Sequence, residues 1–145
     1  MASESSIQSN IIDYINSLSY GRAENVSGNS QQSGRADINA CIDGMPFKIE
    51  VKTEDNSYGR KGATPKQRLY LEKWARAGAI SCVVYSVDDV KLMIHKSLIN
   101  NVECMADLLP PKMVEDIQKL KDSIKPSGRG KWYDVQNKRW VDISY

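Results

Sequence analysis

Apolar residues recur with a helical period at the start of the chain and with a strand period in its middle. Isoleucines spaced four residues apart within residues 4–18 predict an amphipathic helix. Polar and apolar residues alternate over 37–42 and again over 47–53. Asp43-Gly44 lies between these two runs and is a strong signal for a two-residue turn, so the segment predicts a β-hairpin.

The rest of the chain continues to alternate between strands and helices. We expect a weak strand at 21–26, a strand at 80–85, an edge element at 88–94, and polar loops at 27–34 and 54–63. Another helix should begin at Pro65, with Thr64 as its N-cap and Gly78 just past its end. The remaining predicted elements are helices over 98–109 and 113–124 and a hairpin over 132–145 that turns at 136–138. This order of elements is typical of an α/β fold with a mixed central sheet flanked by helices.

The register of the first hairpin brings two acidic residues together. With its turn at the two residues named above, Asp37 faces Glu50 across the ladder, with Cβ atoms roughly 5 Å apart. Period 2 places Lys52 on the same face as Glu50, whereas the reverse face is entirely apolar. Like charges placed opposite each other repel. A divalent cation between the two carboxylates would remove that repulsion.

This arrangement fits the metal site of a phosphodiester hydrolase. Mg²⁺ and Mn²⁺ prefer oxygen ligands, and Mg²⁺ typically uses one or two carboxylates together with waters. Asp37 and Glu50 supply the carboxylates, and the backbone carbonyl of Val51 lies between the side chains that need the metal. A cation held there would activate a water and neutralise phosphoryl charge, and Lys52 would orient that water.

Each of these residues also has a purely structural interpretation. Glu50 and Lys52 could form an ion pair on an exposed strand face, which contributes little stability. Gln67 stands three residues after Thr64 and would complete a capping box. Glu4 could be a first-turn acid favoured by the helix dipole. It also lies on the apolar stripe of its helix, which would direct its carboxylate towards the sheet, with Gln8 one turn further on.

The same residues carry a resemblance to a known family. The matching segments are Gly34-Arg35-Ala36-Asp37, Lys48-Ile49-Glu50-Val51-Lys52-Thr53 and Thr64-Pro65-Lys66-Gln67, followed by Leu71 and Gly78. In this order they resemble the PD-(D/E)xK nuclease superfamily and, within it, the virus-type replication and repair nuclease (VRR-NUC) family. Glu4-Ser5-Ser6-Ile7-Gln8 fits the first helix of that family, whereas Ala36 stands where proline is common. The resemblance covers roughly residues 4 to 90.

The resemblance implies a restriction-endonuclease-like fold and a set of site residues. The expected catalytic residues are Asp37, Glu50, Lys52 and Gln67. The expected ligands of Mg²⁺ or Mn²⁺ are Glu4, Asp37, Glu50 and Val51. Residues 1–94 would form the nuclease core, and residues 95–145 a helical and β-hairpin extension packed on the same domain.

Composition limits the remaining possibilities. The net charge is only +2, so DNA binding must come from local basic residues. The candidates are Arg35, Arg60, Lys61, Lys66 and Arg68, although each could equally be solvated. Three widely spaced cysteines and one histidine predict no zinc site, no disulfide framework, and buried or semi-buried free thiols. No segment approaches the length of a membrane span, which suggests a cytoplasmic protein of a bacterial or phage-infected cell.

The predicted function is therefore that of a metal-dependent endodeoxyribonuclease. The family suggests branched DNA, such as Holliday junctions or flaps, cut during replication, repair or recombination. It also suggests a homodimer that places two sites on two strands. The alternatives are a nuclease for simple duplex or single-stranded DNA and a non-cleaving nucleic-acid-binding module with the same fold. The aromatic residues of the last hairpin could stack on unpaired bases, or they could pack against the C-terminal helices or a partner subunit.

Overall fold

The computed structural model describes residues 3–26, 35–53, 62–105, 119 and 122–144. Its helices are α1 (Glu4–Ser17), α2 (Pro65–Arg76) and α3 (Val87–Met105). Its strands are β1 (Gly21–Asn25), β2 (Ile38–Ile42), β3 (Met45–Val51), β4 (Ile80–Val84), β5 (Lys131–Asp134) and β6 (Arg139–Asp142). The predicted loops at 27–34 and 54–61, and most of the predicted helix at 113–124, lie outside the described residues.

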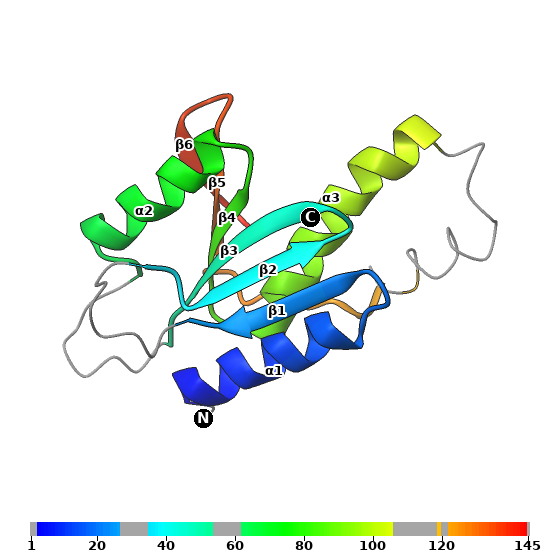
Figure 1. The fold of residues 1–145 in the computed structure, drawn as a ribbon, viewed down its shortest axis with the longest axis horizontal. Helices are drawn as coiled ribbons and strands as arrows, with labels where there is room; N and C mark the ends of the chain where they lie inside the picture. The colour runs from blue at the N-terminus through cyan, green and yellow to red at the C-terminus, as the bar shows by residue number, and fades with distance from the viewer. Residues whose placement is uncertain (1–2, 27–34, 54–61, 106–118, 120–121, 145) are drawn as a thin grey trace.

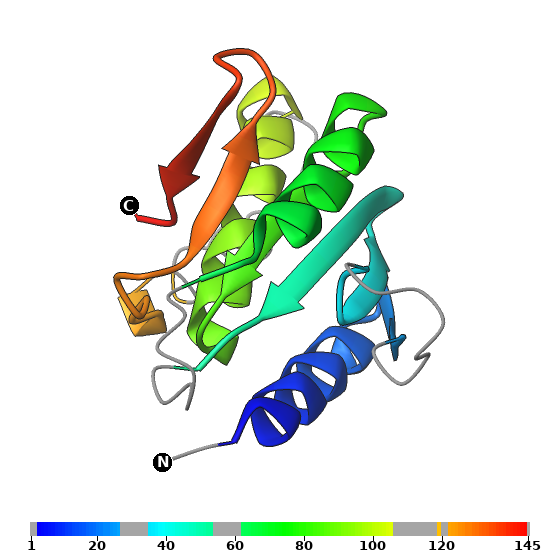
Figure 2. The same cartoon turned by 90° about the vertical axis from the view of Figure 1, so that its left-hand side faces the viewer.

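The strands form one mixed sheet in the order β1-β2-β3-β4-β5-β6. All neighbouring strands are antiparallel except β3 and β4, which are parallel and joined through α2. The helices α1 and α3 cover one face of the sheet and α2 covers the other (Figures 1 and 2). The fold class predicted from the sequence is therefore confirmed.

The larger core lies between the sheet and the helices α1 and α3. Ile11 and Ile15 of α1, Phe47 and Ile49 of β3, and Leu92 of α3 are fully buried there. Burying a large aliphatic or aromatic side chain contributes roughly 1.5–3 kcal/mol. The apolar face of the hairpin is thus fixed against this core, and its polar face is left for α2.

The hairpin has the predicted turn and register. Asp43 and Gly44 both adopt positive φ, at 51° and 79°, as a type I′ turn requires. Ile42 pairs with Met45, and the ladder continues to the pair Ile38 and Ile49. Asp37 and Glu50 are the next positions in this register, so the register prediction is confirmed.

The prediction of an edge element at 88–94 was wrong, because these residues begin α3. Ser86 Oγ accepts a hydrogen bond from the Asp89 amide at 3.2 Å, as an N-cap residue does. Leu92, Met93 and Ile94 are all buried. A short apolar run buried on every side gives no periodic signal, and periodicity therefore cannot distinguish a helix from a strand there. The helix predicted from 98 is the continuation of α3.

The hairpin β5–β6 belongs to the main sheet and is held there by a buried acid. Asp89 is 0% exposed, and its carboxylate accepts hydrogen bonds from the Tyr85 amide and from the amide and hydroxyl of Ser127. Gly130 passes so close that an added Cβ would lie 2.9 Å from the Asp89 carboxylate. The C-terminal strands are thereby fixed next to β4.

The cysteine prediction holds in part. Cys41 and Cys82 are free thiols, and Cys82 is buried as expected. Cys41 is exposed, contrary to the prediction. It lies on β2 opposite Arg22 of β1 and Pro46 of β3, on the sheet face away from the main core.

Candidate active site

The two acids predicted from the hairpin lie together where β2 begins and β3 ends. Asp37 immediately precedes β2, and its Oδ2 accepts a hydrogen bond of 2.8 Å from the Val51 amide. Both residues are buried, with 8% of Asp37 and 0% of Val51 exposed. The N–H and C=O of one strand residue project to the same side of the strand. The Val51 carbonyl therefore lies on the side of β3 that faces Asp37.

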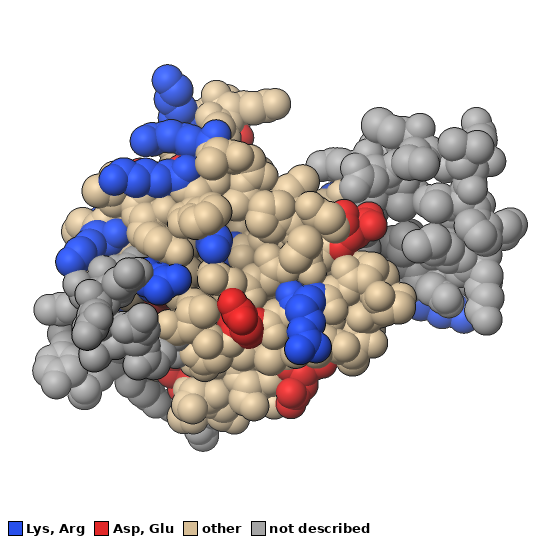
Figure 3. Space-filling model, viewed as in Figure 1, with Lys and Arg blue, Asp and Glu red and all other residues tan. Residues whose placement is uncertain are grey.

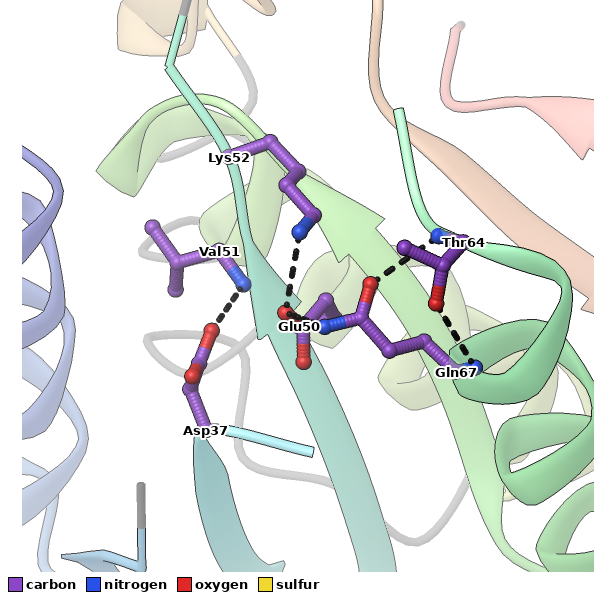
Figure 4. Close-up of polar contacts among 6 residues, drawn as sticks. All are labelled: Asp37, Glu50, Val51, Lys52, Thr64 and Gln67. Carbon is purple, nitrogen blue, oxygen red and sulfur yellow. Dashed lines mark hydrogen bonds and ion pairs between the residues drawn. The ribbon is translucent and has the colours of Figure 1, made fainter. Parts of the chain in front are cut away.

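Glu50 is at the centre of the site, between Asp37, Lys52 and Gln67 (Figure 4). It is only 1% exposed, so it is not part of a surface ion pair. Its Oε1 accepts a hydrogen bond of 2.8 Å from Gln67 Nε2 and lies 3.4 Å from Lys52 Nζ. Its Oε2 is buried without a hydrogen-bond partner in the described structure. A buried, charged carboxylate oxygen without a partner lowers the stability of the folded protein unless a proton or a cation neutralises it.

Gln67 forms the predicted capping box and also contacts Glu50, while its catalytic role stays a prediction. Its side-chain oxygen accepts a 3.0 Å bond from the Thr64 amide, while Thr64 Oγ1 accepts from the Gln67 amide at 3.2 Å. This capping box leaves the side-chain nitrogen of Gln67 to donate to Glu50. The first turn of α2 thus orients an active-site carboxylate through the same amide that caps the helix.

Burial raises the pKa values of both acids. The pKa of Glu50 rises to about 8, first because burial disfavours its charge and then because Asp37 is negative, whereas Lys52 opposes the rise. Burial also raises the pKa of Asp37, although the hydrogen bond that it accepts from the Val51 amide opposes this rise. The two carboxyl groups are adjacent and therefore titrate as a coupled pair, and the raised pKa of Glu50 favours its protonated form below about pH 8 in the metal-free protein.

Glu4 lies near this pair at the first turn of α1. Its pKa is raised by partial burial and by the negative charge of Asp37, and it is lowered by Lys52. Among the described residues, no three acidic, histidine or cysteine side chains are close enough to form a metal-binding group. The structure therefore brings together Asp37 and Glu50, with Glu4 as an electrostatic neighbour. Its role as a metal ligand stays a prediction. Gln8, which is buried, accepts a hydrogen bond from Asn25 of β1.

The predicted DNA contacts lie around this site in part. Lys66 and Arg68 are exposed on the first turn of α2, and Lys and Arg side chains gather over α2 in Figure 3. Arg35 is partly buried, and its charge helps to lower the pKa of Lys48, which burial lowers most. Arg60 and Lys61 lie outside the described residues.

The C-terminal aromatic residues pack against the face that holds the site. Trp140 of β6 packs with Leu71 and Val83, and its Nε1 donates a 2.9 Å hydrogen bond to Glu72 of α2. Tyr133 lies edge-on to Trp140 with ring centroids 5.4 Å apart. Both aromatic residues therefore pack within the protein, but Trp140 packs against α2 and not against the predicted C-terminal helices.

Comparison with known proteins identifies the fold. No family model matches the chain, and no curated protein matches it either. A solved structure described as a VRR_NUC domain protein matches 66% of this chain and 88% of its own, with 22% identical residues and a TM-score of 0.50. This chain has the fold of a VRR_NUC domain protein. The resemblance inferred from the hairpin motif is confirmed at the level of the fold. In the described part of the chain, no helix is long and apolar enough to cross a membrane.

Proposed function

We propose that this protein is a metal-dependent endodeoxyribonuclease. The observation that carries the proposal is the pair of adjacent buried carboxyl groups, one of which has an unpartnered oxygen and a pKa of about 8. Such groups are typical of functional sites, because a structural core gains no stability from them. The VRR_NUC fold of the chain supports the same conclusion.

The residues fit a divalent cation. Asp37, Glu50 and the Val51 carbonyl provide hard oxygen ligands, and two carboxylates are the usual number for Mg²⁺. When bound, Mg²⁺ or Mn²⁺ would neutralise the two acids, polarise the phosphodiester and activate a water. The unpartnered Glu50 oxygen would then be satisfied, which a proton alone achieves only while the pH is below the pKa of this group.

The protein side chains would position the reactants around that cation. Lys52 is 16% exposed and lies beside Glu50, where its ammonium group can hold the attacking water or stabilise charge on the phosphoryl oxygens. Gln67 fixes the Glu50 carboxylate through one hydrogen bond and so limits its rotation. Lys66 and Arg68 lie on the same turn of α2 and would contact phosphates of the strand.

We further propose that the substrate is branched or otherwise structured DNA and that the active form is a homodimer. A junction presents two strands, and one small site cuts one strand at a time. Two-fold symmetry is the commonest way to supply a second site. Cleavage of simple duplex or single-stranded DNA is the alternative within the same chemistry.

The test is to incubate the protein with labelled junction, flap, duplex and single-stranded DNA in Mg²⁺, Mn²⁺ or EDTA. We expect cleavage with either cation, most rapidly on the branched substrates, and none in EDTA. Matched RNA substrates distinguish a deoxyribonuclease from a ribonuclease. Binding to all substrates without any cleavage would favour a non-catalytic binding module instead.

A further inference from the structure

A second feature of the α2 face is a pocket that the metal chemistry does not use. It has a volume of about 380 Å³, within the size range of small-ligand sites. Arg68 of α2, Arg129 and Lys131 line it, and no carboxylate is among its lining residues in the described structure. Its walls also carry Tyr85, at the end of β4, and Trp140 of β6. Cationic and aromatic groups thus converge in one cavity.

The pocket lies next to Glu50. Val83, which lines it, is the β4 partner of Glu50 in the parallel ladder. Neighbouring strands are roughly 4.8 Å apart. Arg68 follows Gln67, which holds the Glu50 carboxylate. A nucleotide next to a phosphate at the metal site would therefore reach this pocket.

Two of the side chains that line the pocket, Trp140 and Lys131, have polar partners outside the lining. The hydrogen bond from Trp140 to Glu72 fixes the indole ring against α2. Tyr85 feels the positive charges of Arg129 and Lys131, which lower its pKa against the larger effect of burial. Lys131 also pairs with Asp142 on β6. Arg68 and Arg129 carry the other two positive charges of the pocket lining.

We propose that this pocket binds one unpaired nucleotide of the DNA strand, next to the phosphodiester that is cut. The arginines would hold its phosphate, and Tyr85 and Trp140 would contact its base. Stacking on aromatic rings accepts any base. A base inside a duplex would first have to leave its stack. This inference rests on the proposed nuclease function and specifies its substrate: a strand with an unpaired nucleotide beside the cut.

The test measures binding of a labelled single strand in EDTA, where no cleavage interferes. The double variant Arg68→Gln/Arg129→Gln should bind at least tenfold more weakly, and the slope of its log affinity against log salt should flatten by about 0.7, the value for one lost phosphate contact on a single strand. The control is Arg76→Gln/Arg139→Gln, which removes the same charge from exposed positions on α2 and β6 outside the pocket lining. It should change affinity less than twofold. Equal losses in both variants would overturn the proposal.

Tyr85 provides an independent test of base contact. Tyr85→Leu should weaken single-strand binding about tenfold, whereas Tyr85→Phe, which keeps the ring, should bind like wild type. Melting curves establish that both variants are folded. An unchanged affinity in a folded Tyr85→Leu protein would contradict base stacking.

A competition experiment distinguishes a pocket for a nucleotide of the substrate strand from a pocket for a free nucleotide. Free deoxynucleoside monophosphate should compete with the labelled strand only at concentrations far above the affinity of that strand, because one nucleotide provides one phosphate contact. Competition by the monophosphate at the affinity of the strand would overturn the proposal in favour of a nucleotide-sensing site. These binding results do not depend on catalysis. A protein that never cleaves DNA could still show the pocket effects, and an active nuclease could lack them.

Discussion

Replacing Glu50 by glutamine should stabilise the metal-free protein at alkaline pH. The pKa of Glu50 rises from 4.5 in a free side chain to about 8 in the folded protein. Protonated Glu50 therefore makes its full contribution to the free energy of unfolding below pH 4.5. This contribution is lost as the pH rises towards 8. At about 1.4 kcal/mol per unit of pKa, the loss is roughly 5 kcal/mol at most, and its coupling to Asp37 makes this an upper value.

Glutamine has the shape of the protonated acid and no charge. It can still accept the hydrogen bond from Gln67, and its amide N–H can donate to Asp37 where the Glu50 proton would. Glu50→Gln and wild type should therefore have similar free energies of unfolding at pH 5. At pH 8.5 the variant should be more stable by about 2–5 kcal/mol.

Urea unfolding in EDTA at pH 5, 7 and 8.5 measures this difference. Glu24→Gln is the control, because it removes the same charge at an exposed position on β1. Its effect should stay within about 0.5 kcal/mol at every pH. A Glu50→Gln protein that is no more stable than wild type at pH 8.5 would refute the assignment of a buried proton to Glu50.

Three further outcomes follow from the same geometry. At limiting Mg²⁺, cleavage should increase with pH up to about 8, because Glu50 must lose its proton before a cation binds; a rate independent of pH would contradict this coupling. Gln67→Ala should lower cleavage at saturating Mg²⁺, whereas Thr64→Ala, which removes one of the capping hydrogen bonds and costs about 1 kcal/mol, should not; equal rates would reduce Gln67 to a capping residue. Light scattering at micromolar concentration should give about twice the 16.3 kDa of one chain, and a monomer that cleaves junctions would remove the dimer from the proposal.

The first half of the fold could be predicted from the sequence because its signals are local. Asp43-Gly44 determines a turn, the turn determines a register, and the register places Asp37 opposite Glu50. Capping residues likewise determine where α2 begins. Each of these steps depends on residues close together in the chain.

The remaining features depend on contacts between distant residues. The burial of Glu50 and its raised pKa require α2 to cover the hairpin, which alternation alone does not predict. The start of α3 was misassigned because Leu92, Met93 and Ile94 are all buried, and such a run has no helical period of apolar and polar residues. The attachment of β5 to β4 depends on Asp89, whose partner Ser127 is 38 residues away along the chain. The pocket formed by Arg68, Tyr85 and Trp140 follows from that attachment.

In the proposed mechanism, Asp37 and Glu50 hold the divalent cation that hydrolysis of DNA requires. The most direct measurement compares wild type and Asp37→Asn on one labelled DNA substrate, in Mg²⁺ and in excess EDTA, with DNA binding measured in parallel. We expect cleavage only by wild type in Mg²⁺, together with DNA binding by both proteins. Cleavage by wild type in excess EDTA, or equal rates for the two proteins in Mg²⁺, would contradict it.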